Sequence, residues 1–471
     1  MLHLPSEHAF RIQPRTGSNS TCRTDLQLSN DTNTAAMLMR RYGPDGYLLE
    51  IEGSEVLSVL AIHKGGCVYE APYRVTRPGR FHVTVVSLYR HTGSGVDERT
   101  LEWHPTDYSP IWAQWVTLEA RRSHLASSCS PPGRWVWPHV TASAYLPVPT
   151  GLCRSRGAQC KRQWVVNASA YEWRRYPECN EPGTPLSWVE PGRFSKCLAR
   201  LNKPTLWLGD SQMRTMLTGS ALLDEAGAIG DQLKLCSLEA AMVPVGGAAP
   251  HRRPSADVGP SVRYSCDIAS CSSRNPNPNP KDMQLLEPRR VIQYWPWGMN
   301  LYDKKTKEGW PIETLPWCDP AGFGAVVLNV GQHFMSAGKV GTPGSSHGTL
   351  RHYRGVVQAL AASVHELRRA RPSVLVVWVE TVCIPLRTDA FVRLHRDWRT
   401  PARVDAYNRL ATPLMRQAGA VVVPAASVVC PMVETSPDNA HPAGFAREPT
   451  LRMALAALCI VSSAHAPESI V

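Results

Sequence analysis

The sequence lacks the features that mark several common protein classes. None of its 14 Cys residues forms a Cys-x-x-Cys pair, so the spacing of zinc modules is absent. No apolar run reaches the roughly 18 residues that span a bilayer, and residues 1–7 do not form a signal peptide. The net charge is +12, from 51 Lys and Arg against 39 Asp and Glu, but no compact basic run with interleaved aromatic residues occurs. We therefore expect no metal site and no nucleic-acid partner.

The cysteines and glycosylation sequons favour an oxidising compartment instead. Asn-x-Ser/Thr sequons occur at Asn19, Asn30 and Asn167, and the many cysteines have irregular spacings that suit disulfides. Both features indicate the lumen of the secretory pathway. Because neither a signal nor a membrane span is visible, there are two alternatives. Either an anchor is missing from this chain, or the lumenal placement is wrong.

The length of 471 residues and the 43% apolar content predict more than one domain. Residues 1–35 are polar and predict a flexible lead-in. Residues 36–122 contain short alternating runs separated by turn signals, which predict a small β-sandwich without catalytic residues. Residues 123–200 are rich in Trp, Pro and Cys with poor periodicity. They predict an irregular segment that disulfides hold against the next domain.

Residues 201–471 alternate strand-like and helix-like patterns and predict an α/β domain with a doubly wound parallel sheet. Pro, Asn and Gly dominate residues 244–290, which we interpret as a loop insertion. The expected elements are strands at 205–209, 325–330, 373–380 and 420–423 and helices at 212–223, 350–369 and 404–418.

The stretch Gly209-Asp210-Ser211 ends the first of these strands and precedes a helix. A serine at such a junction lies beside free backbone N–H groups, which suit a nucleophilic oxygen and the oxyanion that it creates. The alternative is that Asp210 or Ser211 only caps the helix, since both residue types are preferred caps.

Two further motifs follow predicted strands. Asn329 and Gly331 close the strand at 325–330, and Asp438 and His441 lie beyond the strand at 420–423. Catalytic groups of such sheets gather at the carboxyl ends of the strands. His441 could then act as base for Ser211, with Asp438 orienting its ring. The Asn329 amide and the backbone N–H groups of Ser211 and Gly331 would form an oxyanion hole. Each motif alone also fits an ordinary turn or a local hydrogen bond.

Arg214 and His333 each have two possible interpretations. Arg214, one helical turn beyond Ser211, either supports the oxyanion or the substrate or forms a surface ion pair. His333 is either a substrate-binding residue or a half-buried structural histidine.

These motifs resemble the GDSL/SGNH hydrolase superfamily, and within its PC-esterase branch the neurexophilin and PC-esterase (NXPE) family. The resemblance rests on Gly209-Asp210-Ser211, on Gly331-Gln332-His333-Phe334 and on Asp438-x-x-His441-Pro442. The run Pro78-Gly79-Arg80-Phe81-His82-Val83 is similar to the filamin-type immunoglobulin domain of that family. The Cys/Trp-rich lead-in and Arg214 also resemble plant trichome-birefringence-like O-acetyltransferases.

The resemblance implies an SGNH-like catalytic domain after an immunoglobulin/filamin-like sandwich. It implies Ser211 as nucleophile, His441 as base and Asp438 as orienting acid. The implied activity is glycan O-acetyl transfer through an acetyl-serine in the Golgi or secretory pathway. This activity needs no bound cofactor. It does need a glycan acceptor and an acetyl donor such as acetyl-CoA. Two alternatives remain: a carbohydrate acetylesterase with the same triad, and a secreted glycan-binding or interaction protein without activity.

Overall fold

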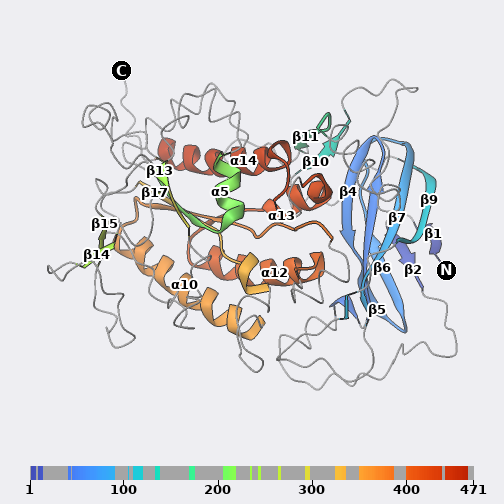
Figure 1. Ribbon diagram of the computed structural model, residues 1–471, viewed down its shortest axis with the longest axis horizontal. Helices are drawn as coiled ribbons and strands as arrows, with labels where there is room; N and C mark the ends of the chain where they lie inside the picture. The colour runs from blue at the N-terminus through green and yellow to red at the C-terminus, as the bar shows by residue number, and fades with distance from the viewer. Residues whose placement is uncertain are drawn as a thin grey trace.

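The computed structural model contains a β-sandwich and an α/β part that lie side by side (Figure 1). The residues that it describes are 2–6, 9–13, 41–43, 45–90, 104–105, 110–119, 133–137, 169–175, 205–218, 234–235, 242–244, 264–266, 292–296, 324–335, 350–386, 399–436 and 441–464. The sequons at Asn19, Asn30 and Asn167 and most of the predicted insertion at 244–290 lie outside these ranges. Only the short antiparallel pair β14 (Met242–Pro244) and β15 (Tyr264–Cys266) is described around that insertion.

Two antiparallel sheets form the sandwich. The first has the order β1 (Leu2–Ser6), β2 (Ala9–Ile12), β6 (Val68–Pro72), β5 (Ile62–Gly65). The second has the order β11 (Glu172–Arg175), β10 (Gly133–Val136), β4 (Glu55–Leu60), β3 (Asp45–Glu52), β7 (Gly79–Arg90), β8 (His104–Pro105), with β9 (Pro110–Leu118) also paired to β7. Alternate residues such as Leu49, Val83 and Tyr69 face one shared apolar core, as the period of two predicts for strands.

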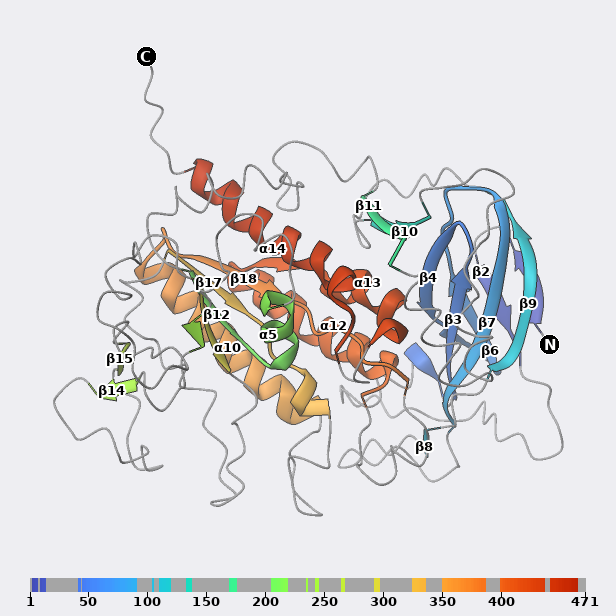
Figure 2. The same ribbon diagram turned by 45° about the horizontal axis from the view of Figure 1, so that its top comes forward.

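Two expectations about this region were wrong. Residues 2–6 and 9–12 belong to strands rather than to a flexible lead-in, because Phe10 is fully buried in the sandwich core and β2 pairs with β6. The described residues of the 123–200 segment also extend the sandwich sheet, since β10 pairs with both β4 and β11. Trp135 of β10 nevertheless contacts the α/β part through its Nε1–H, which donates to the Val428 carbonyl oxygen at 2.7 Å. Figure 2 shows β10 between the sandwich and the helix that holds Val428.

The second part is an α/β fold around a parallel sheet. Its order is β13 (Lys234–Leu235), β16 (Ile292–Pro296), β12 (Thr205–Gly209), β17 (Ala325–Leu328), β18 (Leu375–Val379), β19 (Val421–Val423). The helical elements are α5 (Ser211–Thr218), η6 (Gln332–Met335), α10 (Leu350–Ala370), α12 (Pro401–Gln417), α13 (Ala425–Val429), η7 (Cys430–Thr435) and α14 (Gly444–Ala464).

Helices cover both faces of this sheet. The helices α10 and α12 pack on one face, whereas α5, α13 and α14 pack on the other (Figure 1). The strands are therefore buried on both sides and consist of continuous apolar runs, as in Val326–Leu328 and Leu375–Val379. Within the part of the chain that the structure describes, no helix is long and apolar enough to cross a membrane.

The strand order places a topological switch point between β12 and β17. From β12 the chain passes to the edge strand β13 and returns to β16 on the same side, whereas from β17 it continues on the other side to β18 and β19. Connections at the carboxyl ends of β12 and β17 therefore diverge, and such a divergence leaves a crevice in which open α/β sheets bind ligands. The two ends stay joined, because the Asn329 N–H donates to the Leu208 carbonyl oxygen at 2.9 Å.

Candidate active site

The first two predicted motifs meet at this switch point. Gly209 ends β12, and Ser211 is the first residue of α5. A β-carbon on Gly209 would lie 2.7 Å from Met213 Cβ and 3.4 Å from the Asn329 carbonyl oxygen. A glycine is therefore needed to let the first turn of α5 lie close to the end of β12. The side chains of Ser211, Arg214 and His333 lie outside the described residues, as does the whole of Asp438.

Asp210 caps α5, which confirms the cap interpretation for this residue. Its Oδ1 accepts the Gln212 N–H at 2.8 Å, and the side chain is almost fully buried. Burial raises the pKa of Asp210 from 3.8 to about 6. The N–H groups of Gln212 and Gln332 and the charges of Arg399 and His441 lower this pKa and limit the rise.

His441 belongs to the same cluster. It is half-buried, precedes α14, and lies close enough to Asp210 for its charge to lower the pKa of that carboxyl. The two residues are more than 200 positions apart in the chain. The charge of His441 therefore acts on the residue next to Ser211, whereas the predicted contact of His441 with the Ser211 hydroxyl involves a side chain outside the described residues.

Asn329 binds the neighbouring strand end. Its Nδ2 donates to the Val379 carbonyl oxygen at 2.9 Å, and the residue is buried. An amide nitrogen carries two hydrogens, so an oxyanion role would have to use the second one. Gln332 makes a similar contact, because its Nε2 donates to the Val382 carbonyl oxygen. Both side chains thus bind the 379–382 segment to the end of β17.

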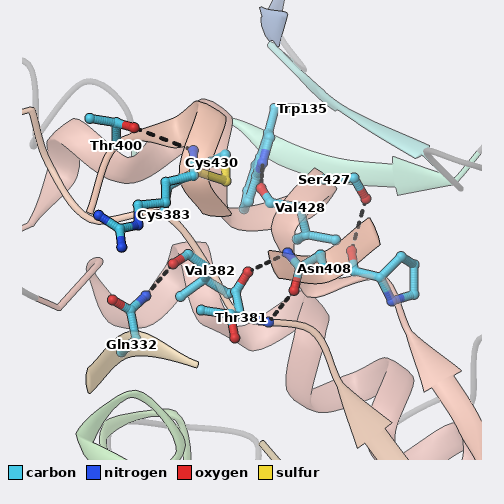
Figure 3. Close-up of a disulfide and its surroundings, with 12 residues drawn as sticks. Trp135, Gln332, Thr381, Val382, Cys383, Thr400, Asn408, Ser427, Val428 and Cys430 are labelled. Atoms are coloured by element: carbon cyan, nitrogen blue, oxygen red, sulfur yellow. Dashed lines mark hydrogen bonds between the residues drawn. A yellow bond between two sulfur atoms is a disulfide. The ribbon is translucent and has the colours of Figure 1, made fainter. Parts of the chain in front are cut away.

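Sequence reasoning missed the residues that hold this segment. The Thr381 N–H donates to Asn408 Oδ1 at 2.9 Å, and Asn408 Nδ2 donates to the Thr381 carbonyl oxygen at 2.8 Å (Figure 3). Asn408 lies on α12 and is buried. An amide in the middle of an otherwise apolar helix face was the signal that could have identified it. Sequence reasoning also missed Arg399, which lies just before α12 and whose charge lowers the pKa of Asp210.

A disulfide fixes the same segment on its other side. Cys383 and Cys430 are bonded, with their Cα atoms 5.0 Å apart, and so join the chain after β18 to η7 (Figure 3). Cys67 and Cys459 each take part in a disulfide as well, and no free cysteine occurs among the described residues. Disulfides are most common in proteins of oxidising compartments.

A small cavity of about 20 Å³ lies behind α5. The residues that line it are Gln212, Met213, Met216, Asn329, Val379, Glu380, Val382, Val429, Arg447 and Thr450. This volume accommodates about one water molecule and no sugar ring. No group of three or more His, Cys, Asp or Glu residues within the described ranges is placed to hold a metal ion.

Comparison with known proteins identifies no relative. No family model, no curated protein and no solved structure matches the chain. The functional conclusion therefore depends on the residues at the switch point and on their chemistry.

Proposed function

We propose that the protein is a serine-dependent O-acetyltransferase that acetylates glycan hydroxyl groups through an acetyl-Ser211 intermediate. In this proposal the α/β part is an SGNH-like catalytic domain, and the sandwich is its immunoglobulin/filamin-like partner. The observation that supports the proposal is the electrostatic influence of His441 on Asp210, which relates the histidine of the third motif to the residue next to Ser211.

Each step uses one group of the triad. Ser211 Oγ attacks the acetyl carbonyl carbon of a donor such as acetyl-CoA while His441 accepts its proton. The donor thiol leaves with that proton, and the acetyl group remains on Ser211. A sugar hydroxyl then attacks the acetyl-serine, giving its proton to His441, which returns it to Ser211 Oγ. Asp438 keeps the imidazole in the tautomer that these transfers need.

The oxyanion of each tetrahedral intermediate needs hydrogen-bond donors. The backbone N–H groups of Ser211 and Gly331 and the second amide hydrogen of Asn329 are the candidates at this edge of the sheet. Arg214 and His333 remain candidates for supporting the oxyanion or binding the substrate. The disulfides support a Golgi or secretory-lumen location.

The alternative activity is that of a carbohydrate acetylesterase. The acetyl-Ser211 intermediate would be the same, but water instead of a sugar hydroxyl would attack it, so both activities use the same residues. A secreted glycan-binding protein without catalysis is the third candidate.

The deciding experiment measures acetyl transfer and acetyl-ester hydrolysis by the purified full chain. We expect Ser211→Ala and His441→Gln to abolish both reactions, and mass spectrometry to find one acetyl group on the Ser211 peptide of the wild type. Matched controls are Ser427→Ala, whose hydroxyl donates to the Pro424 carbonyl oxygen at 2.8 Å, and the exposed His365→Gln. Full activity in Ser211→Ala would refute the mechanism. The ratio of acetyl transfer to hydrolysis, measured with a glycan acceptor present, separates a transferase from an esterase. A wild-type protein that binds glycans without turnover would instead be the glycan-binding protein without catalysis.

A further inference from the structure

We propose that Tyr353 and Thr381 are positioning residues of the oxyanion hole, because they hold the peptide group that carries the Gly331 N–H. The proposal rests on the proposed function, in which this N–H is one of the oxyanion donors. In this role neither side chain touches the substrate. Both act through the Val330–Gly331 peptide group, whose direction decides where the N–H points.

Hydroxyl groups from two elements hold the Val330 carbonyl oxygen. Tyr353 of α10 donates to it at 2.8 Å, and the Thr381 hydroxyl, in the segment after β18, lies 3.3 Å from it. Both side chains are fully buried. Thr381 is itself fixed, because its N–H and its carbonyl oxygen both bind Asn408. The Val330 carbonyl therefore has one direction, toward α10 and the end of β18.

The direction of this carbonyl also fixes the direction of the Gly331 N–H. The two groups belong to one planar trans peptide, in which the C=O and the N–H point to opposite sides. In the sheet, β17 lies between β12 and β18. An N–H that points away from the end of β18 therefore faces the end of β12, where the Gly-Asp-Ser turn begins.

The backbone just before Gly331 agrees with this direction. The Asn329 N–H donates to the Leu208 carbonyl oxygen of β12 at 2.9 Å. The Asn329 carbonyl oxygen also faces β12, since it lies 3.4 Å from the position that a β-carbon on Gly209 would take. In an extended chain, residues two positions apart direct their N–H groups to the same side. The N–H groups of Asn329 and Gly331 thus face the same neighbouring strand end.

The Gly331 N–H is available to a ligand. Gly331 is buried, and its carbonyl oxygen accepts the Phe334 N–H at 3.1 Å, but its own N–H is bonded to no acceptor within the described part of the chain. Buried backbone N–H groups are almost always paired. A buried N–H that is held toward the turn of Ser211 and has no acceptor there suits the oxyanion that Ser211 would create.

The test compares Tyr353→Phe with Tyr407→Phe by NMR. Each variant keeps its buried ring and loses one hydroxyl that donates to a backbone carbonyl oxygen, but Tyr407 binds Phe334 at 3.0 Å instead of Val330. Labelling valine carbonyl carbons with ¹³C and glycine amides with ¹⁵N selects the Val-Gly pairs, of which the chain has four. Loss of one signal in Val330→Ile identifies the Val330–Gly331 pair. We expect this signal to move in Tyr353→Phe and to stay in place in Tyr407→Phe.

An unchanged Val330–Gly331 signal in a folded Tyr353→Phe protein overturns the proposal. If that variant does not fold, hydrogen exchange of the wild type decides. We expect the Gly331 N–H to exchange faster than the hydrogen-bonded N–H groups of Asn329 and Phe334. Equal protection of all three would mean that the Gly331 N–H has an acceptor within the protein, which also overturns the proposal. Neither measurement needs turnover, so its outcome is independent of the Ser211→Ala assay that tests the proposed function.

In the active enzyme the same two variants separate positioning from stability. Removing an oxyanion donor lowers kcat by roughly 10²–10³-fold, and misdirecting one should have part of this effect. We expect Tyr353→Phe to lower kcat about tenfold with little change in KM, because the oxyanion is absent from the bound substrate. Thr381→Val should lower kcat in the same way. Equal kcat values for Tyr353→Phe and Tyr407→Phe would show that Tyr353 has no positioning role.

Discussion

The Thr381 hydroxyl oxygen occupies the space beside Gly331 that any larger residue would need. A β-carbon at Gly331 would lie 2.0 Å from Thr381 Oγ1 and 3.0 Å from Thr381 Cβ. Thr381 cannot retreat easily, because Asn408 binds both its N–H and its carbonyl oxygen. The close contact joins the end of β17 to the segment after β18, at the edge where the candidate active site lies.

Replacing Gly331 by alanine should therefore destabilise the protein. Overpacking of a buried position costs about 1–3 kcal/mol, and we expect a loss of this size in chemical denaturation. The double variant Gly331→Ala/Thr381→Ala should recover part of the loss, because it removes the nearest atom. Gly355→Ala is the matched control, since no atom lies within 4 Å of its added β-carbon. That change should stabilise α10 by up to about 1 kcal/mol. Equal stability of Gly331→Ala and the wild type would contradict the predicted clash.

Removing the Cys383–Cys430 disulfide should also lower stability. The two cysteines are 47 positions apart, and a loop of that size corresponds to a loss of about 4 kcal/mol in the chain-entropy model. The measurement compares thermal unfolding of the wild type with that of Cys383→Ser/Cys430→Ser. Non-reducing peptide mapping should recover the linked pair from the wild type. Recovery of either cysteine with another partner would contradict the assignment.

Local patterns predicted the α/β elements well. The helix expected at 350–369 spans Leu350–Ala370, because Val357, Leu360 and Val364 repeat at helical spacing and all face the core. The strand ending at Gly209 and the cap at Asp210 were likewise visible, since both depend on neighbouring residues alone.

What could not be predicted depends on distant partners. Residues 9–12 are too few to show alternation, and their strand depends on pairing with β1 on one side and with β6, about sixty positions later, on the other. The direction of the Asn329 amide depends on the Val379 carbonyl oxygen, which belongs to another strand. The sequence could therefore place Asn329 at the site but could not show that its amide binds the protein's own backbone.

Glu380 should make stability fall as the pH rises. Burial raises its pKa from 4.5 to about 7, although hydrogen bonds from the Thr412 hydroxyl and the Ala426 N–H lower it in part. The folded protein thus keeps a proton that the unfolded chain releases, so stability is lost as the pH rises through about 7. Glu380→Gln removes this linkage, and at about pH 8 we expect it to be more stable than the wild type by on the order of 2 kcal/mol.

The control for this effect is Glu366→Gln, an exposed position on α10. Its pH dependence of unfolding should match that of the wild type. Urea denaturation at several pH values measures both variants. A wild-type curve that stays parallel to the Glu380→Gln curve from acid to alkaline pH would show that Glu380 has an ordinary pKa.

The contact of Trp135 with Val428 should couple unfolding of the sandwich to that of the α/β part. Trp135 is buried, stacks edge-on against Trp173 of β11, and contacts Phe445 of α14 in the same geometry. Trp135→Phe keeps an aromatic ring but leaves the Val428 carbonyl oxygen without its donor. The expected cost is about 1–3 kcal/mol. Trp115→Phe is the matched control, because Trp115 is 40% exposed, and it should change stability by less than about 0.5 kcal/mol.

The larger change Trp135→Ala tests the coupling itself. It removes the ring that touches both β11 and α14, with an expected loss of about 3–5 kcal/mol. Calorimetry should then resolve two transitions where the wild type has one, because the sandwich has an apolar core of its own and fewer contacts join it to the α/β part. Leu48, Val86 and Leu88 of the sandwich still pack in the core cluster of the α/β part. A single transition in Trp135→Ala at the wild-type temperature would mean that contacts other than Trp135 hold the two parts together. The short hydrogen bond from the Tyr42 hydroxyl to Asp405 of α12 would then be the first alternative to remove.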